Sequence, residues 1–256
     1  MKIKFALISL YDKSQIKNIL KVLKKYKIKI ISSGGTYEKI KSLGYKCIEV
    51  SEYTNFPEIL DGRVKTLHPK IHGGILGRTN LIKHKKEMEQ HDIEPINLVV
   101  VNLYPFSEAV NKGLSFEECI ENIDIGGPSM IRSAAKNHEN VCVITDPEDY
   151  EEIDKILDKN SGSTSLEERK LYASKAFSKT AFYDSLISQW FNKELTILWP
   201  KTVTIAGKLI EQLRYGENPH QKSAVYKKMD QNLDGVVKAK LLQGKALSYN
   251  NLNDSD

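Results

Sequence analysis

Blocks of apolar and polar residues alternate along the chain, and their spacing changes from one segment to the next. Short runs of consecutive apolar residues predict strands at residues 3–8, 28–31, 46–50, 98–102 and 141–145. Apolar positions at helical spacing predict helices over residues 13–26 and 36–43. We expect a further helix through Leu157, because Asp146 and Pro147 suit its N-cap and first turn. This order predicts an α/β fold with a mostly parallel sheet that carries helices on both faces.

The pattern changes after about residue 158. Apolar residues such as Phe177, Ala181 and Trp190 predict one long helix over residues 165–190. Residues 192–200 are expected to link this helix to a second region. We therefore expect one domain over residues 1–195 and a separate region over residues 196–256.

Composition places the chain among ordinary globular proteins. Of its 256 residues 40% are hydrophobic, and no apolar run approaches the ~20 residues that cross a bilayer. The start of the chain has no export signal, so we expect a cytoplasmic protein without a membrane partner. Cys47, Cys119 and Cys142 are widely spaced, which indicates reduced thiols and no metal site. The net charge of +5 comes largely from helix faces without interleaved aromatic residues, which argues against nucleic-acid binding.

Small and polar residues gather directly after the predicted strands. Ser9 and Lys13 follow the first strand, the segment Ser33-Gly34-Gly35-Thr36 follows the second, and Asn102 and Tyr104 close the strand at 98–102. In parallel sheets the ligand crevice lies beyond the carboxyl ends of the strands. The Ser-Gly-Gly-Thr segment opens into a helix, where amides and hydroxyls can hold a phosphate, although many ordinary helices begin this way. It lacks the spacing of a P-loop or of GxGxxG, which favours a mononucleotide or small phosphate over NAD or ATP.

A basic segment spans residues 62–74 and contains no acidic residue. Its cationic side chains are those of Arg63, Lys65, His68, Lys70 and His72, and glycines flank them at both ends. This composition fits a loop shaped around an anion. A solvated basic surface loop is the alternative, and the segment alone only slightly favours phosphate or nucleotide binding.

A second glycine-rich helix start follows Asp124. Pro128 suits the first helical position after Gly126 and Gly127, and Lys136 lies farther along the same predicted helix. Asp124 fits a plain turn residue and equally an acid/base group whose pKa is tuned by its neighbours. The residues alone leave both interpretations open.

Several segments in order closely resemble a known enzyme domain. They are residues 12–14, 33–36, 51–61, 62–74, 102–106, 124–128 and 134–138. Together they resemble the inosine monophosphate (IMP) cyclohydrolase domain of the bifunctional purine-biosynthesis proteins that also carry AICAR formyltransferase, from the N-terminus to about Trp190. The resemblance implies a methylglyoxal-synthase-like fold. It also implies that formyl-AICAR, a formamido-imidazole-carboxamide ribotide, closes to IMP with loss of water and without a cofactor.

The resemblance also assigns residues to the site. It implies that Lys65, Tyr104, Asp124 and Lys136 are catalytic. Asp124 would transfer a proton at the carboxamide, Lys65 and Tyr104 would act at the formyl oxygen, and Lys136 would hold the carboxamide. The implied substrate-binding residues are Ser9, Lys13, Ser33, Gly34, Gly35, Thr36, Arg63, Thr66, Asn102, Gly126 and Gly127. Tyr11 departs from the family, where a smaller residue is common at the edge of the phosphate site.

Beyond residue 195, segments 214–221 and 244–251 resemble the opening of the formyltransferase domain. The resemblance implies that Arg214 and Tyr215 would touch the aminoimidazole ribotide, and that the transferase uses 10-formyltetrahydrofolate and forms a homodimer in the full-length protein. Its catalytic Lys–His pair has no counterpart here, so we expect no formyl transfer from this chain, and we expect His220 to be a binding or structural residue. Residues 1–195 are thus assigned to the cyclohydrolase domain, and residues 196–256 to a linker and the beginning of a second α/β domain.

Two other functions occur on this fold. A phosphate-effector-binding module, as in carbamoyl phosphate synthetase, would need the phosphate pocket but not Lys65, Tyr104 and Asp124 together. Methylglyoxal synthase would need an acidic base placed differently, near the N-terminal strands, and a shorter chain.

Overall fold

The computed structural model describes residues 1–229 and 242–255, and the chain forms two units, Met1–Thr180 and Ala181–Asp256. The elements that begin in the first unit are β1 (Phe5–Leu10), α1 (Ile16–Lys25), β2 (Lys29–Ser32), α2 (Gly34–Ser42), β3 (Ile48–Glu49), α3 (Val50–Thr54), the 3-10 turn η1 (Leu60–Gly62), α4 (Pro69–Leu76), α5 (Ile82–Gln90), β4 (Leu98–Asn102), α6 (Phe106–Asn111), α7 (Phe116–Glu121), α8 (Gly126–Lys136), β5 (Cys142–Ile144), the 3-10 turn η2 (Pro147–Asp149), α9 (Tyr150–Lys159) and α10 (Leu166–Glu194).

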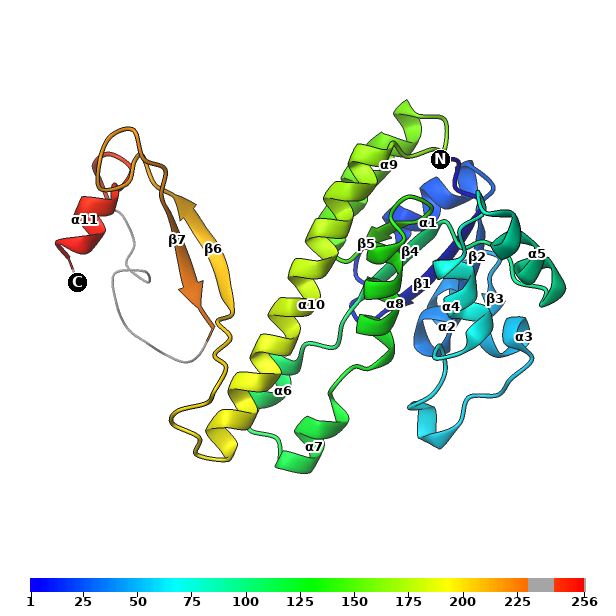
Figure 1. Ribbon diagram of the computed structural model, residues 1–256, viewed down its shortest axis with the longest axis horizontal. Coiled ribbons are helices and arrows are strands. Elements are labelled where there is room, and N and C mark those ends of the chain that lie inside the picture. Colours follow the sequence, from blue (N-terminus) through cyan, green and yellow to red (C-terminus); the bar gives the residue numbers. More distant parts are fainter. Residues whose placement is uncertain (230–241, 256) are drawn as a thin grey trace. The chain divides into compact units, whose positions relative to one another are not determined.

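A five-stranded sheet in the order β3-β2-β1-β4-β5 forms the centre of the first unit (Figure 1). Every neighbouring pair is parallel, and Leu7 of β1 lies opposite Ile31 of β2 and Val99 of β4. The predicted α/β fold with a parallel sheet is therefore confirmed. The strand order reverses beside β1, where the chain leads to β2 on one side and to β4 on the other. Such a switch point opens a crevice at the carboxyl ends of the two central strands.

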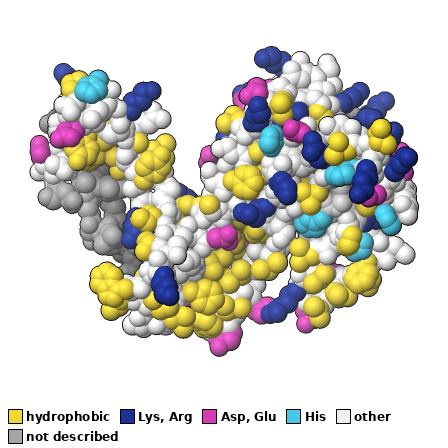
Figure 2. All heavy atoms as spheres, viewed as in Figure 1, with side chains coloured by type: hydrophobic (Ala, Val, Ile, Leu, Met, Phe, Trp, Pro, Cys, Tyr) yellow, Lys and Arg dark blue, Asp and Glu magenta, His cyan; other side chains and the backbone are white. Residues whose placement is uncertain are grey.

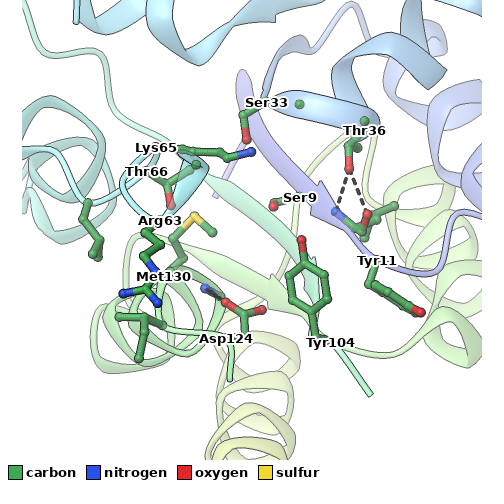
Figure 3. A pocket seen from close by; sticks show the side chains of 18 of the residues that line it. Ser9, Tyr11, Ser33, Thr36, Arg63, Lys65, Thr66, Tyr104, Asp124 and Met130 are labelled. Carbon is green, nitrogen blue, oxygen red and sulfur yellow. Dashed lines mark hydrogen bonds between the residues drawn. The ribbon is translucent and has the colours of Figure 1, made fainter. Parts of the chain in front are cut away.

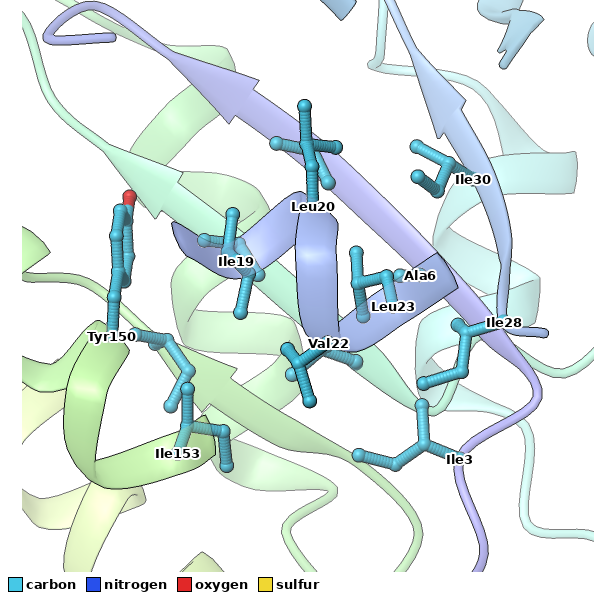
Figure 4. Packing of buried hydrophobic residues seen from close by; sticks show 14 of the residues in the cluster. Ile3, Ala6, Ile19, Leu20, Val22, Leu23, Ile28, Ile30, Tyr150 and Ile153 are labelled. Atoms are coloured by element: carbon cyan, nitrogen blue, oxygen red, sulfur yellow. The ribbon is translucent and has the colours of Figure 1, made fainter. Parts of the chain in front are cut away.

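Both faces of the sheet are covered, which explains why its strands are continuous apolar runs. On one face, alternate residues of β1 such as Ala6 and Ile8 join Ile19 and Leu23 of α1 and Ile153 of α9 in one buried cluster (Figure 4). On the other face, α8 packs against β4, β5 and α4. Burial on two sides holds the strand ends, and therefore the crevice, in place.

Several predicted boundaries need correction. The strand expected at 46–50 is reduced to Ile48–Glu49, because the carboxylate of Glu49 accepts from the Ser51 N–H and starts α3. The second half of the basic segment 62–74 is not a loop but helix α4, whose N-cap His68 accepts from the Lys70 N–H through Nδ1. Asp146 caps η2, which leads into α9.

The helix after Asp124 also starts earlier than expected. It begins at Gly126, so Pro128 occupies the third helical position and not the first. Helices α5, α6 and α7 were not predicted. A Ser115–Glu118 capping box marks the start of α7 and is a signal that the sequence does contain.

The second unit is described by itself. It contains the antiparallel pair β6 (Gly207–Gln212) and β7 (Ala224–Lys228) and the short helix α11 (Tyr249–Asn253). Backbone hydrogen bonds from Arg214 N to Leu247 O and from Tyr249 N to Tyr215 O join the two transferase-like segments. The expected boundary at residue 195 stays a prediction, and residues 230–241 of the region assigned to the second domain lie outside the described part.

Lys and Arg side chains are spread over the face of the first unit in Figure 2, with acidic side chains and histidines between them. Cys119 and Cys142 are buried and Cys47 is half-buried, and all three are free thiols. In the described residues, no helix is long and apolar enough to cross a membrane, and no cluster of His, Cys, Asp and Glu has a metal-binding arrangement.

One threonine ties helix α2 to the end of β1. The Thr36 hydroxyl accepts from the Leu10 N–H at 2.9 Å and donates to the Leu10 carbonyl at 3.0 Å, and both bonds are buried. A single side chain therefore satisfies both backbone groups of Leu10 where the sheet ends.

Replacing Thr36 by valine keeps the side-chain shape and removes the hydroxyl. We expect Thr36→Val to lower the free energy of unfolding by about 1–3 kcal/mol, because a buried N–H and a buried carbonyl lose their partner. Thr36→Ser keeps the hydroxyl and should lower the free energy of unfolding less than Thr36→Val does. Urea unfolding followed by circular dichroism measures the difference, and a valine variant as stable as the parent chain would contradict this role.

Candidate active site

A cavity of about 580 Å³ lies at the carboxyl ends of β1, β2 and β4 (Figure 3). It is lined by Ser9, Leu10, Tyr11, Lys13, Ser33, Gly34, Gly35, Thr36, Asp61, Gly62, Arg63, Lys65, Thr66, Leu67, Asn102, Tyr104, Ile120, Glu121, Ile123, Asp124, Ile125, Gly126, Gly127 and Met130. Its volume falls in the range of about 300–1,000 Å³ that is typical of small-molecule sites. The crevice predicted from the strand ends is therefore present.

The amino-terminal end of α2 forms one wall. Ser33 is the N-cap residue in an extended conformation, and Gly34 has a φ of +52°, which side chains other than glycine rarely adopt. Two lysines lie above this turn: a Cβ placed on Gly34 would lie 3.4 Å from Lys65 Nζ, and one placed on Gly35 would lie 3.9 Å from Lys13 Nζ. Burial lowers the pKa of Lys13, although Asp12 opposes the effect. Two ammonium groups over the positive end of a helix make an anion-binding wall.

Carboxylates already pair with two cations of the cavity region. Lys65 Nζ lies 2.9 Å from Glu58 Oε1, and the Arg63 guanidinium binds both carboxylate oxygens of Glu121 on α7. These side chains are between one third and two thirds exposed, so the pairs are weak and a ligand can exchange with them. Glu121 lines the cavity and was not predicted as a site residue.

Asp124 and the start of α8 form the opposite wall (Figure 3). Burial raises the pKa of Asp124, and hydrogen bonds from the backbone N–H groups of Gly127 and Tyr104 partly oppose the shift. The Gly127 N–H donates to Asp124 Oδ1 at 2.8 Å. A Cβ on Gly127 would lie 2.5 Å from Asp124 Oδ2, so only glycine lets the helix come this close to the carboxylate. A half-buried carboxyl whose pKa is raised by burial suits proton transfer.

Tyr104 follows β4 and presents its ring at the mouth of the cavity. In Figure 3 its hydroxyl points into the cavity, toward Ser9. The ring is 48% exposed and packs against the ring of Tyr11, with centroids 5.1 Å apart. A phenol in this position can donate a hydrogen bond to a ligand held in the cavity.

All eleven predicted substrate-binding residues line this cavity, as do the predicted catalytic residues Lys65, Tyr104 and Asp124. Two of the binding residues have side chains that serve the fold. The Thr36 hydroxyl is taken by Leu10, and the Asn102 carboxamide binds the backbone of Tyr11 and Asp12. These bonds place the neighbouring backbone at the wall of the cavity.

Lys136 is the predicted catalytic residue that, within the described part of the chain, does not line the cavity. It is the exposed last residue of α8, six positions after Met130, the last residue of this helix that lines the cavity, which at about 1.5 Å per residue puts it about 9 Å farther along the helix. Its catalytic role stays a prediction.

Known protein families match two consecutive parts of the chain. Residues 15–129 match the MGS-like domain, and residues 134–256 match the AICARFT/IMPCHase bienzyme. The chain is also similar to a solved structure described as ForH, with 31% identity and a TM-score of 0.65, over 74% of this chain and 97% of that one.

Curated relatives match over the whole chain. The bifunctional purine biosynthesis proteins PurH of Bradyrhizobium diazoefficiens, Rhodospirillum rubrum and Leptospira biflexa are 51%, 50% and 52% identical to it. The matches cover 98%, 100% and 100% of this chain but 47%, 48% and 49% of the relatives, so the chain spans about half their length. The resemblance drawn from the motifs is confirmed: the chain belongs to the PurH family of bifunctional purine biosynthesis proteins.

Proposed function

We propose that this chain closes formyl-AICAR to IMP with loss of water, as an IMP cyclohydrolase of de novo purine biosynthesis. The observation that carries the proposal is one cavity with an anion-binding wall at Lys13, Lys65 and α2, and with a half-buried carboxyl of raised pKa at Asp124 on the opposite side. A ribotide has its phosphate at one end and its reacting groups at the other. The membership in the PurH family supports the same reaction.

The reaction requires the carboxamide nitrogen to attack the formyl carbon of the same molecule. Holding the two groups in a near-attack geometry supplies much of the rate, and the walls of the cavity serve this purpose. Lys13 and the α2 amides would bind the phosphate. The ionised Asp124 would accept a proton from the carboxamide nitrogen as the new C–N bond forms.

The formyl oxygen gains negative charge during this attack, and Lys65 and the Tyr104 hydroxyl would stabilise it and protonate it to a hydroxyl. The C–O bond then breaks as the former formamido nitrogen loses its proton and forms a C=N bond to the same carbon. The hydroxyl takes up a second proton and leaves as water, so the two protons lost by the nitrogens balance the two gained by the oxygen. No step in this sequence uses a cofactor.

We also infer functions for the formyltransferase part of the full-length proteins of this family. A formyltransferase that uses 10-formyltetrahydrofolate would supply the formylated substrate, and Arg214 and Tyr215 would belong to its binding site. The full-length protein would be a cytoplasmic homodimer that binds neither nucleic acid nor membrane.

An effector-binding module is the second candidate. It would use the anion wall, but it gives no reason to hold a carboxyl with a raised pKa on the opposite wall of the same cavity. Mixing the chain with formyl-AICAR in the absence of folate separates the two functions. A module would leave the spontaneous rate unchanged, whereas an enzyme would form IMP faster.

The first prediction for the enzyme concerns single alanine variants. Asp124→Ala and Lys65→Ala should each lower kcat by roughly 10²- to 10⁴-fold, which is typical for loss of an acid/base group or of charge stabilisation. Lys136→Ala should lower kcat less than either of these variants, because Lys136 lies at the far end of α8. IMP formation followed by absorbance measures all three. Equal losses for Lys136→Ala and Lys65→Ala would place Lys136 in the site after all.

A second prediction concerns pH. If ionised Asp124 is the base, kcat should rise with pH through a pKa above the ordinary aspartate value, because burial raises the pKa of this carboxyl. The residual kcat of Asp124→Asn should not show this rise with pH.

The same shift has a consequence for stability. A pKa raised by folding means that the contribution of Asp124 is full below the unfolded pKa and is lost as pH rises through the folded pKa. The free energy of unfolding of Asp124→Asn relative to the parent should therefore increase over that window. Urea titrations at several pH values test this, and a difference that does not change with pH would contradict the raised pKa.

A third prediction concerns Glu121, which competes with ligand anions for Arg63. Glu121→Gln should bind IMP roughly twofold to fivefold more tightly, as expected for release of one exposed ion pair. Glu117→Gln on the same helix is the control and should bind like the parent chain. Titration calorimetry at fixed salt measures both, and unchanged affinity in Glu121→Gln would mean that Arg63 does not hold the ligand.

A further inference from the structure

The ring of Tyr11 packs against the ring of Tyr104 at the mouth of the cavity (Figure 3). The ring centroids are 5.1 Å apart and the planes are inclined by 57°. This is within the range in which aromatic pairs attract one another. Both rings are about half exposed, at 46% and 48%, so neither is held by deep burial.

The backbone of Tyr11 is fixed from both sides. Its N–H donates to Asn102 Oδ1 at 2.7 Å, and its carbonyl accepts from Lys13 Nζ at 3.1 Å. The Asn102 carboxamide also binds the N–H and the carbonyl of Asp12. Asn102 is the last residue of β4, so the end of β4 sets the place from which the Tyr11 ring projects.

The backbone of Tyr104 is fixed as well, but its ring can still turn. Its N–H donates to the carboxyl of Asp124, and its carbonyl accepts from the Phe106 N–H at 2.9 Å. The side-chain torsions remain, and they decide whether the hydroxyl lies over the cavity. Because the Tyr11 ring occupies one side of Tyr104, it limits these torsions to those that keep the hydroxyl over the cavity.

The two hydroxyls differ in direction. Figure 3 shows the Tyr104 hydroxyl pointing into the cavity and the Tyr11 hydroxyl pointing away from it. The contact that Tyr11 makes with Tyr104 is therefore made by its ring and not by its hydroxyl.

We propose that Tyr11 is a positioning residue that holds the Tyr104 ring in the orientation needed at the formyl oxygen, an inference that rests on the proposed cyclohydrolase function. Tyr11 acts through Tyr104 and does not itself touch the reacting atoms. Loss of its ring lets the Tyr104 hydroxyl leave its place during turnover. This loss lowers kcat and does not weaken the binding of the ribotide.

The experiment compares Tyr11→Ala with Tyr11→Phe in the intact chain. Tyr11→Ala should lower kcat by about threefold to tenfold, the effect of losing one aromatic pair, with KM changed less than about twofold. Tyr11→Phe keeps the ring and should retain most of kcat. Tyr226→Ala removes an exposed ring from the other unit and should leave both constants unchanged.

Three kinetic outcomes overturn the proposal. They are an unchanged kcat in Tyr11→Ala, a loss confined to KM, and a loss in Tyr11→Phe as large as in Tyr11→Ala. The last outcome would assign the effect to the Tyr11 hydroxyl.

A fluorine resonance gives a readout that does not need activity. With 3-fluorotyrosine at position 104, the ¹⁹F signal should shift in Tyr11→Ala and stay near its original place in Tyr11→Phe. If the parent chain does not accelerate ring closure, the proposed function fails, and the resonance still decides whether Tyr11 sets the Tyr104 ring. An unmoved signal in Tyr11→Ala overturns the inference by itself.

Discussion

Backbone groups that lose their sheet partners at the end of β1 must find other hydrogen bonds, because burying them unpaired is costly. Two side chains from neighbouring elements meet this need. Thr36 of α2 binds both backbone groups of Leu10, and Asn102 of β4 binds the N–H groups of Tyr11 and Asp12 and the Asp12 carbonyl. The same bonds place the start of α2, the backbone of Tyr11 and the beginning of the segment that carries Lys13. The site therefore depends on a constraint of the fold, namely the satisfaction of strand ends at the switch point.

The carboxyl and the cations of the cavity are controlled by different neighbours. Burial raises the pKa of Asp124, and the backbone N–H groups of Gly127 and Tyr104 partly oppose the shift. Lys65 and Arg63 are instead paired with Glu58 and Glu121. A ligand dianion can exchange with these exposed carboxylates at little cost, because such pairs contribute about 0–1 kcal/mol. In the proposed reaction the cations would bind the ligand, and Asp124 would exchange a proton.

The sequence predicts much of this fold because buried parallel strands are apolar on both faces, as at 98–102, and because glycine and serine mark the ends of strands. It predicts less where one residue has two uses. The glycines and cations after Gly62 indicate a loop. His68 and Pro69, however, also suit the start of a helix, and the structure has helix α4 there. Thr36 and Asn102 have the chemistry of ligand contacts, and their side chains also bind the backbone. The sequence names Lys136 but does not place it, because a motif gives the residue type, whereas the position of Lys136 at the end of α8 follows from where the helix begins and ends.

Helix α8 runs from Asp124, the proposed base, to a segment that the buried side chain of Arg169 holds in place. Its first turn contacts Asp124 through Gly127, and the chain after its last turn is held by Arg169 of α10, which is 5% exposed. The guanidinium donates to the carbonyls of His138 and Glu139 at 2.7 and 3.1 Å, and also to the Thr164 carbonyl. Burial lowers the pKa of Arg169, and these carbonyls replace the water that its charge has lost. Because a closely packed helix transmits displacements along its length, the Arg169 guanidinium near one end of α8 helps to fix the Asp124 carboxyl at the other end.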